Sequence, residues 1–133
     1  MADSPLVLSV GQCSYDHGSI SRALRQDFNA TVEGADTHAQ ALKALRAGTA
    51  GKYALVLVNR VTDVDGSLGL DLIQTIKADP TLAHLPLMLV SNYTDAQATA
   101  QTAGALPGFG KSDIGSNRFH DTLKPILAPQ HTH

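Results

Sequence analysis

The chain has 133 residues, of which 43% are hydrophobic and 17% are charged. This length suits one compact domain with a core, and the composition excludes both a disordered chain and a membrane-embedded one. A formal net charge of -2 with scattered Lys and Arg residues argues against nucleic-acid binding. The sequence has no 18-residue apolar stretch, and residues 1–5 lack the basic and apolar regions of a secretion signal, so we expect a cytoplasmic protein without nucleic-acid or membrane partners.

Short apolar runs alternate with segments of helical period along the chain, which is the pattern of βα units around a parallel sheet. The predicted strands cover residues 6–10, 30–33, 53–59, 87–91 and 108–110. The third run is apolar on both faces, as a central parallel strand should be. It is therefore expected in the middle of the sheet.

Apolar residues at helical spacing predict a helix after each of the first three strands. These residues are Ile20, Ala23, Leu24 and Phe28, then Ala41, Leu42 and Leu45, then Leu72, Ile73 and Ile76. Thr37 with Gln40 and Thr94 with Gln97 have the spacing of a capping box, so helices are expected to begin at both places.

Two further helices are predicted after the fourth and fifth strands. The first, at 95–103, is built mainly from Ala, Gln and Thr residues and so has only a thin apolar face. The second, at 116–127, uses Phe119, Leu123 and Ile126, and Pro125 is expected to distort it or to end it early.

Five βα units of this size predict an α/β fold, a five-stranded doubly wound parallel sheet of flavodoxin-like strand order 2-1-3-4-5 with helices on both faces. The domain is expected to span 1–128, followed by a flexible tail at 129–133. In such a sheet the functional crevice lies at the carboxyl ends of the strands. The residues expected at that edge are Gly11, Gln12, Cys13, Asn59, Ser91, Asn92 and Lys111.

Three positions at this edge form a pattern. The third predicted strand ends in Asn59, the fourth ends in the hydroxyl residue Ser91, and Lys111 follows Gly104 by seven residues. In this layout, and over nearly its whole length, the sequence resembles the receiver domain of bacterial two-component response regulators. The resemblance implies a place in a phosphorelay, with Asn59 standing where the family has its phosphorylated aspartate and Lys111 matching the family's lysine.

The sequence departs from the receiver pattern at the positions that carry its chemistry. Besides Asn59, Gly11 and Gln12 stand where the resemblance expects an acidic pair that holds Mg²⁺, and Gly108 stands at the aromatic switch position. An amide cannot be the carboxylate nucleophile of phosphoryl transfer, and Mg²⁺ needs anionic oxygen ligands. The resemblance therefore implies a degenerate receiver, or pseudo-receiver, that is not an enzyme and holds no metal or cofactor.

Lys111 loses its usual carboxylate neighbours in this reading of the sequence. We expect either that Asp63, Asp65 or Asp113 folds back to pair with it, or that its ammonium group reaches solvent or donates to the carbonyl oxygen of Asn59. A polar pair of the second kind would stabilise the end of the sheet without any ligand.

Two other groups invite a chemical reading. Asp63 and Asp65, followed by Gly66, resemble the start of a calcium loop, but the remaining ligands do not follow. We interpret this segment as an acidic turn in which Gly66 takes a positive φ. Cys13 and His17 are four residues apart, yet no catalytic constellation accompanies them, so an ordinary loop cysteine is the preferred interpretation.

The leading hypothesis is a phosphorylation-independent protein-interaction module in signalling, whose partner is another protein or a second copy of the chain. The expected contact face comprises the fourth helix, the fifth strand and the fifth helix, although its aromatic residues would alternatively pack the core. The candidate residues there are Ala96, Ala100, Phe109 and Phe119. The alternative is a domain that binds a small ligand or anion through Lys111, Ser91, Gln12 and the amides near Gly11. A third hypothesis, an enzyme that uses Cys13, ranks last.

Overall fold

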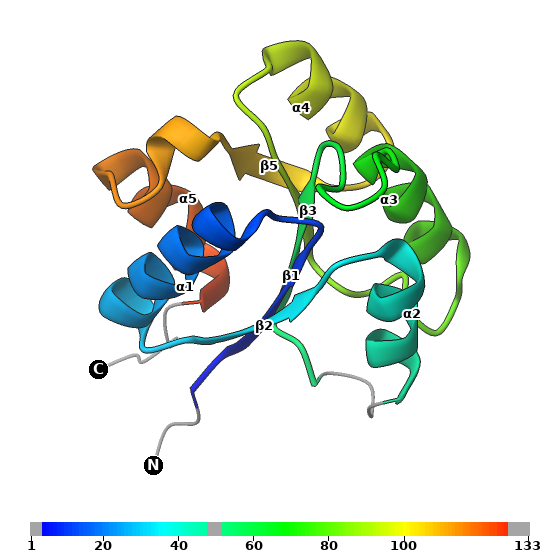
Figure 1. The fold of residues 1–133 in the computed structure, drawn as a ribbon, viewed down its shortest axis with the longest axis horizontal. Helices are drawn as coiled ribbons and strands as arrows, with labels where there is room; N and C mark the ends of the chain where they lie inside the picture. The colour runs from blue at the N-terminus through cyan, green and yellow to red at the C-terminus, as the bar shows by residue number, and fades with distance from the viewer. Residues whose placement is uncertain (1–3, 48–51, 128–133) are drawn as a thin grey trace.

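A computed structural model describes residues 4–47 and 52–127 of the chain (Figure 1). It contains a five-stranded parallel sheet in the order β2-β1-β3-β4-β5. This arrangement confirms the predicted α/β class and strand order. The tail predicted at 129–133 lies outside the described residues.

The elements alternate along the chain as predicted. The strands are β1 (Leu6–Val10), β2 (Thr31–Ala35), β3 (Leu55–Asn59), β4 (Leu87–Val90) and β5 (Leu106–Phe109). The helices are α1 (Ser14–Phe28), α2 (His38–Ala47), α3 (Gly69–Ala78), α4 (Thr94–Thr102), the short 3₁₀ turn η1 (Lys111–Asp113) and α5 (Asn117–Leu127). Strand β5 begins earlier than predicted because it is an edge strand, where Pro107 is tolerated.

Two apolar layers enclose the sheet. Helices α1 and α5 cover one face and α2, α3 and α4 cover the other, as Figure 1 shows. Every residue of β3 is buried. Leu55 and Leu57 pack on the face covered by α1 and α5, and Val56 and Val58 pack on the face covered by α2, α3 and α4. The central position predicted for this strand is confirmed, because only a strand covered on both faces buries both sets of side chains.

Pro125 does not end its helix early, so that part of the expectation is wrong. Helix α5 continues through this residue to Leu127. A proline removes one backbone donor, but Pro125 itself is exposed while Leu123 and Leu127 are buried against the sheet. Packing of that apolar face holds the last turn in place.

The two predicted capping boxes have different outcomes. At α2, Thr37 Oγ1 accepts a hydrogen bond from the Gln40 amide at 3.1 Å, and Gln40 Oε1 accepts one from the Asp36 amide at 2.8 Å. At α4, by contrast, Thr94 is already the first helical residue, Tyr93 holds the cap position without a side-chain bond, and Gln97 is used elsewhere. Its Nε2 donates to the Leu89 carbonyl at 2.8 Å. The capping box predicted for Thr94 and Gln97 is therefore wrong, since the Gln97 side chain bonds to the sheet instead of to the start of its own helix.

Candidate functional site

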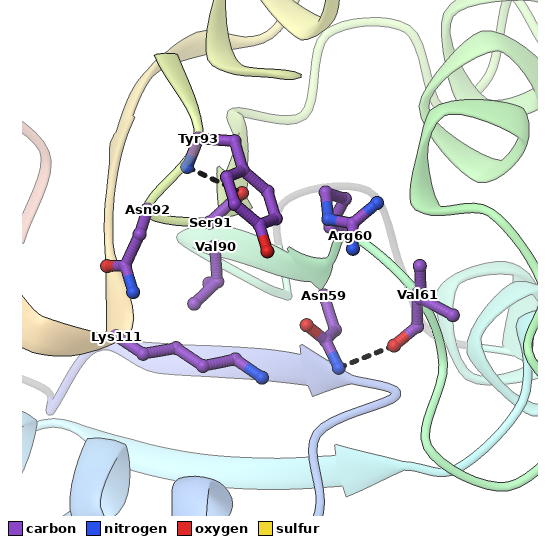
Figure 2. Close-up of a pocket in the computed structure, with 8 residues that line it drawn as sticks. All are labelled: Asn59, Arg60, Val61, Val90, Ser91, Asn92, Tyr93 and Lys111. Atoms are coloured by element: carbon purple, nitrogen blue, oxygen red, sulfur yellow. Dashed lines mark hydrogen bonds between the residues drawn. The ribbon is translucent and has the colours of Figure 1, made fainter. Parts of the chain in front are cut away.

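Asn59 lies at the carboxyl end of β3 and is only 5% exposed. Its Nδ2 donates to the Gly11 carbonyl at 2.9 Å and to the Val61 carbonyl at 2.7 Å, the second of which is drawn in Figure 2. A carboxylate only accepts hydrogen bonds and cannot replace either contact. The amide of Asn59 therefore joins the loop after β1 to the loop after β3.

Lys111, the first residue of η1, pairs with a residue that the sequence reasoning did not consider. Its Nζ lies 3.0 Å from Asp16 Oδ2, in the first turn of α1. The expectation of a partner among the three named aspartates is thus wrong, and so is that of a bond to the Asn59 carbonyl. Helix α1 lies on the same face of the sheet as α5, which places its first turn next to η1. Asp113 instead accepts a hydrogen bond from the Gly110 amide at 2.9 Å.

The acidic segment after β3 is a closed turn. The carboxylate of Asp65 accepts hydrogen bonds from Thr62 Oγ1 and from the Ser67 amide, and Gly66 has a φ of 73°. The hydroxyl donor first, and then the Ser67 donors, lower the pKa of Asp65 to about 2. The interpretation as an acidic turn with a positive φ at Gly66 is confirmed. Neither Asp65 nor its neighbour Asp63 reaches Lys111.

A cavity of ≈ 230 Å³ opens at the carboxyl ends of β3 and β4 (Figure 2). Asn59, Ser91, Asn92 and Lys111 line it, so the fold brings together four of the residues expected at this edge. Two further lining residues were missed, Arg60 and Tyr93. The guanidinium carbon of Arg60 lies 4.8 Å from the centre of the Tyr93 ring, a cation–π contact. Arg60 could have been predicted at this site, because it directly follows Asn59, the last residue of β3.

Gly11 and Gln12 do not complete this cavity. Gly11 has a φ of 76°, and a side chain there would collide with Thr62, so this position serves a tight turn. Gln12 is buried and lines a separate cavity of ≈ 320 Å³ on the α1 side of the sheet. The predicted anion-binding set is therefore divided, because Gln12 is not among the residues around Lys111.

Gly108 permits a close backbone approach between β5 and its neighbour. A Cβ at this position would collide with the carbonyl oxygen of Leu89. The Gly108 amide donates to Gln97 Oε1 at 3.1 Å, in the region where the pairing of β4 and β5 is irregular. Glycine is therefore required at the predicted switch position because any larger residue would push β5 away from β4.

The contact residues predicted on the α4–β5–α5 face are mostly unavailable. Phe109 is 1% exposed and Phe119 is fully buried, and their rings form an edge-to-face pair with centres 4.8 Å apart. Ala100 is also buried, and only Ala96 is half-buried. The expectation of aromatic anchors at the surface is wrong, and the alternative that these residues pack the core is confirmed, because the two rings fill the space between β5 and α5.

Large apolar side chains are exposed at the carboxyl edge instead. They are Tyr15 at 77%, Val64 at 60%, Leu68 at 51% and Tyr93 at 60%. Tyr15 follows β1, Val64 and Leu68 follow β3, and Tyr93 follows β4, so all four surround the end of the sheet that carries Asn59. We call these four residues the apolar rim.

Cys13 has a structural role at the start of α1. Its Sγ accepts a hydrogen bond from the Asp16 amide at 3.4 Å and so caps the helix. Within residues 4–47 and 52–127, no group of three His, Cys, Asp or Glu side chains is arranged to hold a metal ion. No helix in this part of the chain is long and apolar enough to cross a membrane.

No protein-family model matches the chain, and no curated protein matches it. Solved structures do match. A response regulator from Chloroflexus aurantiacus J-10-fl aligns with a TM-score of 0.79 at 18% identity, over 96% of this chain and 100% of that one. The bacteriophytochrome response regulator AtBRR gives 0.76 at 20% identity over 99% of both chains. A response regulator from Thermotoga maritima gives 0.75 at 23% identity over 93% of this chain and 98% of that one.

These similarities establish the fold. The five-stranded parallel sheet of order 2-1-3-4-5 with its five helices is the flavodoxin-like fold of response-regulator receiver domains. At identities of 18–23%, the likeness concerns architecture, and function has to be argued from the residues at the site.

Proposed function

We propose that this chain is a degenerate receiver domain that acts in signalling by binding a protein partner, without accepting a phosphoryl group at Asn59. The observation that carries the proposal is the pair of hydrogen bonds from Asn59 Nδ2 to the Gly11 and Val61 carbonyls. These bonds make the amide a part of the scaffold. A reacting carboxylate at this position would face two carbonyl oxygens and would be repelled by them.

The surroundings of Asn59 support the same proposal. Phosphoryl transfer needs a nucleophile and compensation for the charge of the phosphoryl oxygens. Lys111 could supply that charge, but its ammonium group is already paired with Asp16. The positions that the resemblance assigns to metal ligands are Gly11, which forms a tight turn, and Gln12, which faces another cavity. The described residues around Asn59 therefore lack a complete set of groups for phosphoryl transfer.

We place the partner contacts on the apolar rim rather than on the α4–β5–α5 face. Exposed apolar patches mark interaction sites, and Tyr and Arg side chains are enriched among the residues that carry the binding energy of protein interfaces. Arg60 lies among them against the ring of Tyr93 and offers its guanidinium group to a carboxylate. The rim therefore fits a protein surface that has apolar side chains and an acidic residue. A second copy of the chain is the other occupant to be tested.

Two measurements test this function. Beryllofluoride with Mg²⁺, a phosphoryl mimic, should leave the amide NMR spectrum unchanged, and localised shifts around Asn59 and Lys111 would overturn the proposal. For the partner, wild type and the double variant Leu68→Ser, Tyr93→Ser should be compared in affinity capture from the native cell. The matched control is Leu106→Ser. Leu106 is also exposed, but it is the first residue of β5 and so lies at the amino ends of the strands, away from the apolar rim.

Recovery of the same partner by wild type and control, but not by the rim variant, is expected. Equal recovery by all three proteins would remove the rim from the proposal. A concentration-dependent dimer in ultracentrifugation that the rim variant abolishes would identify the second copy as the occupant.

Anion binding is the second candidate function, and one observation favours it. Arg60 and Lys111, two cations, line the same ≈ 230 Å³ cavity. Inorganic phosphate should then raise the melting temperature of the wild type more than that of Arg60→Gln, since binding to the folded state stabilises it. Equal responses of both proteins to phosphate would exclude this candidate.

A further inference from the structure

The second cavity, of ≈ 320 Å³, lies between the first turns of α1 and the carboxyl ends of β1 and β2. Its walls include Ser9 of β1, Gln12 of the following loop, His17 of α1 and Gly34 of β2. It is separate from the cavity at Asn59, with which it shares no lining residue. The volume is at the lower end of the range for small-molecule sites, roughly 300–1,000 Å³.

Two side chains in this cavity are buried without a hydrogen-bond partner. Ser9 is 1% exposed and Gln12 is 8% exposed. Across the residues that the structure describes, neither Ser9 Oγ nor the amide atoms Nε2 and Oε1 of Gln12 has a partner. Buried polar groups are nearly always paired, because an unpaired one loses its hydration without compensation. The described protein supplies no partner for these three atoms and they are closed to solvent, so a molecule in the cavity pairs with them once the Ser9 and Gln12 side chains turn toward it.

Glycine keeps the cavity open. Gly34 lies on β2 beside the ring of His17, and a Cβ at residue 34 would come within 3.1 Å of His17 Cε1. A larger side chain at this position would fill the space between β2 and α1. Gly34 is itself exposed on an edge strand, so the cavity can be entered from solvent.

The charges around the cavity exclude an anion as the preferred ligand. Asp36 is the acidic residue in its wall, and no Lys or Arg of the described chain lines it. The remaining polar groups are neutral hydroxyls and amides, together with His17. An uncharged molecule therefore matches the wall better than a phosphate or a carboxylate does.

We propose that this cavity binds a small uncharged ring molecule that has an amide or lactam edge, such as a pyrimidine base. The side-chain amide of Gln12 places a donor next to an acceptor, which is the complement of a lactam N–H beside its C=O. Ser9 Oγ supplies a third hydrogen bond. The proposal is independent of the function assigned to the Asn59 cavity.

Uracil is the probe, and its N,N′-dimethyl derivative, which has the same ring without N–H donors, is the control ligand. Titration with uracil should give saturable NMR shifts of the Gln12 side-chain amide and of the Gly34 backbone amide, with a dissociation constant at or below about 1 mM, as weak hydrogen-bonded fragments show. The dimethyl compound should give none. An absence of saturable shifts, or equal shifts with both compounds, overturns the proposal.

Variants make the test specific. Gln12→Met keeps the length of the side chain and removes its polar atoms, and should weaken uracil binding about tenfold or more. Gln101→Met, the same change at an exposed position of α4, is the control and should bind as wild type does. Gly34→Val should also abolish binding by filling the cavity.

The melting temperature separates a binding role from a structural one. Without ligand, Gln12→Met should melt no lower than the wild type, because no hydrogen bond within the described protein is lost. A clearly lower melting temperature for Gln12→Met, together with unchanged uracil binding, would show that Gln12 is a structural residue and would overturn the proposal.

Discussion

Lys111 and Asp16 form an ion pair, with 3.0 Å between Nζ and Oδ2, that joins the turn after β5 to the first turn of α1. The side chains are 39% and 16% exposed, so solvent screens the pair and its contribution to stability is about 1 kcal/mol or less. Its main consequence is positional. The ammonium group lines the cavity at Asn59 and is held there against the first turn of α1 by its bond to Asp16.

Removal of this partner should change anion binding more than stability. Asp16→Asn releases Lys111, and we expect a higher affinity for inorganic phosphate with a loss of stability of about 1 kcal/mol or less. Asp71→Asn is the matched control, because Asp71 also lies in the first turn of a helix. Phosphate titrations followed by NMR check the affinity. A phosphate response of Asp16→Asn no larger than that of the control would show that Lys111 is not restrained by Asp16.

Asn59→Asp should weaken the fold without creating a phosphorylation site. The change removes two donated hydrogen bonds and directs a carboxylate at the Gly11 and Val61 carbonyls, at a cost of about 1–3 kcal/mol. Urea unfolding measures this loss, and mass spectrometry after incubation with acetyl phosphate tests for modification.

The control for that variant is Asn92→Asp. Asn92 Oδ1 accepts hydrogen bonds from Ser112, and a carboxylate oxygen can do the same, so we expect a change within about 0.5 kcal/mol. A phosphorylated Asn59→Asp protein would contradict the view that the site lacks more than its nucleophile.

Stability should depend on Asp65 at acidic pH. The donors Thr62 and Ser67 lower its folded-state pKa from the ordinary value of 3.8 to about 2. A depressed pKa stabilises the protein above the unfolded-state value, and this contribution is lost as the pH falls from about 3.8 to about 2. The free energy of unfolding of Asp65→Asn, measured in urea over this pH range, should depend less steeply on pH than that of the wild type. Asp63→Asn is the control, and an identical slope for Asp65→Asn and the wild type would contradict the assignment.

Gly108→Ala should be strongly unfavourable. The new methyl group would collide with the Leu89 carbonyl, and overpacking of this kind costs about 1–3 kcal/mol. Gly18→Ala is a control with the opposite expected sign, because a Cβ there meets only the side chain of Arg22 and alanine favours a helix by about 1 kcal/mol. Thermal unfolding compares the two variants. A Gly108→Ala protein as stable as the wild type would show that β4 and β5 can separate at no cost.

The elements of the fold were predictable because their signals are local. The run that forms β3 is apolar at each of its positions before Asn59, and the spacing of Ile20, Ala23 and Leu24 belongs to one face of a helix. Boundaries were less accurate where packing overrides propensity. Strand β5 illustrates this, since it covers Leu106–Phe109 at the edge of the sheet whereas 108–110 was predicted.

The amino-acid sequence by itself determined which side chains stand at the ends of the strands, including Asn59, Ser91 and Lys111, because strand ends follow from hydrophobic patterning along the chain. Only the tertiary structure decided what those side chains contact. Lys111 meets Asp16 from the other end of the chain, Gln97 bonds to the strands on either side of its helix, and Gln12 lines a second cavity. Such pairs depend on how α1 and α4 pack on the sheet, and that packing is set by the whole apolar core.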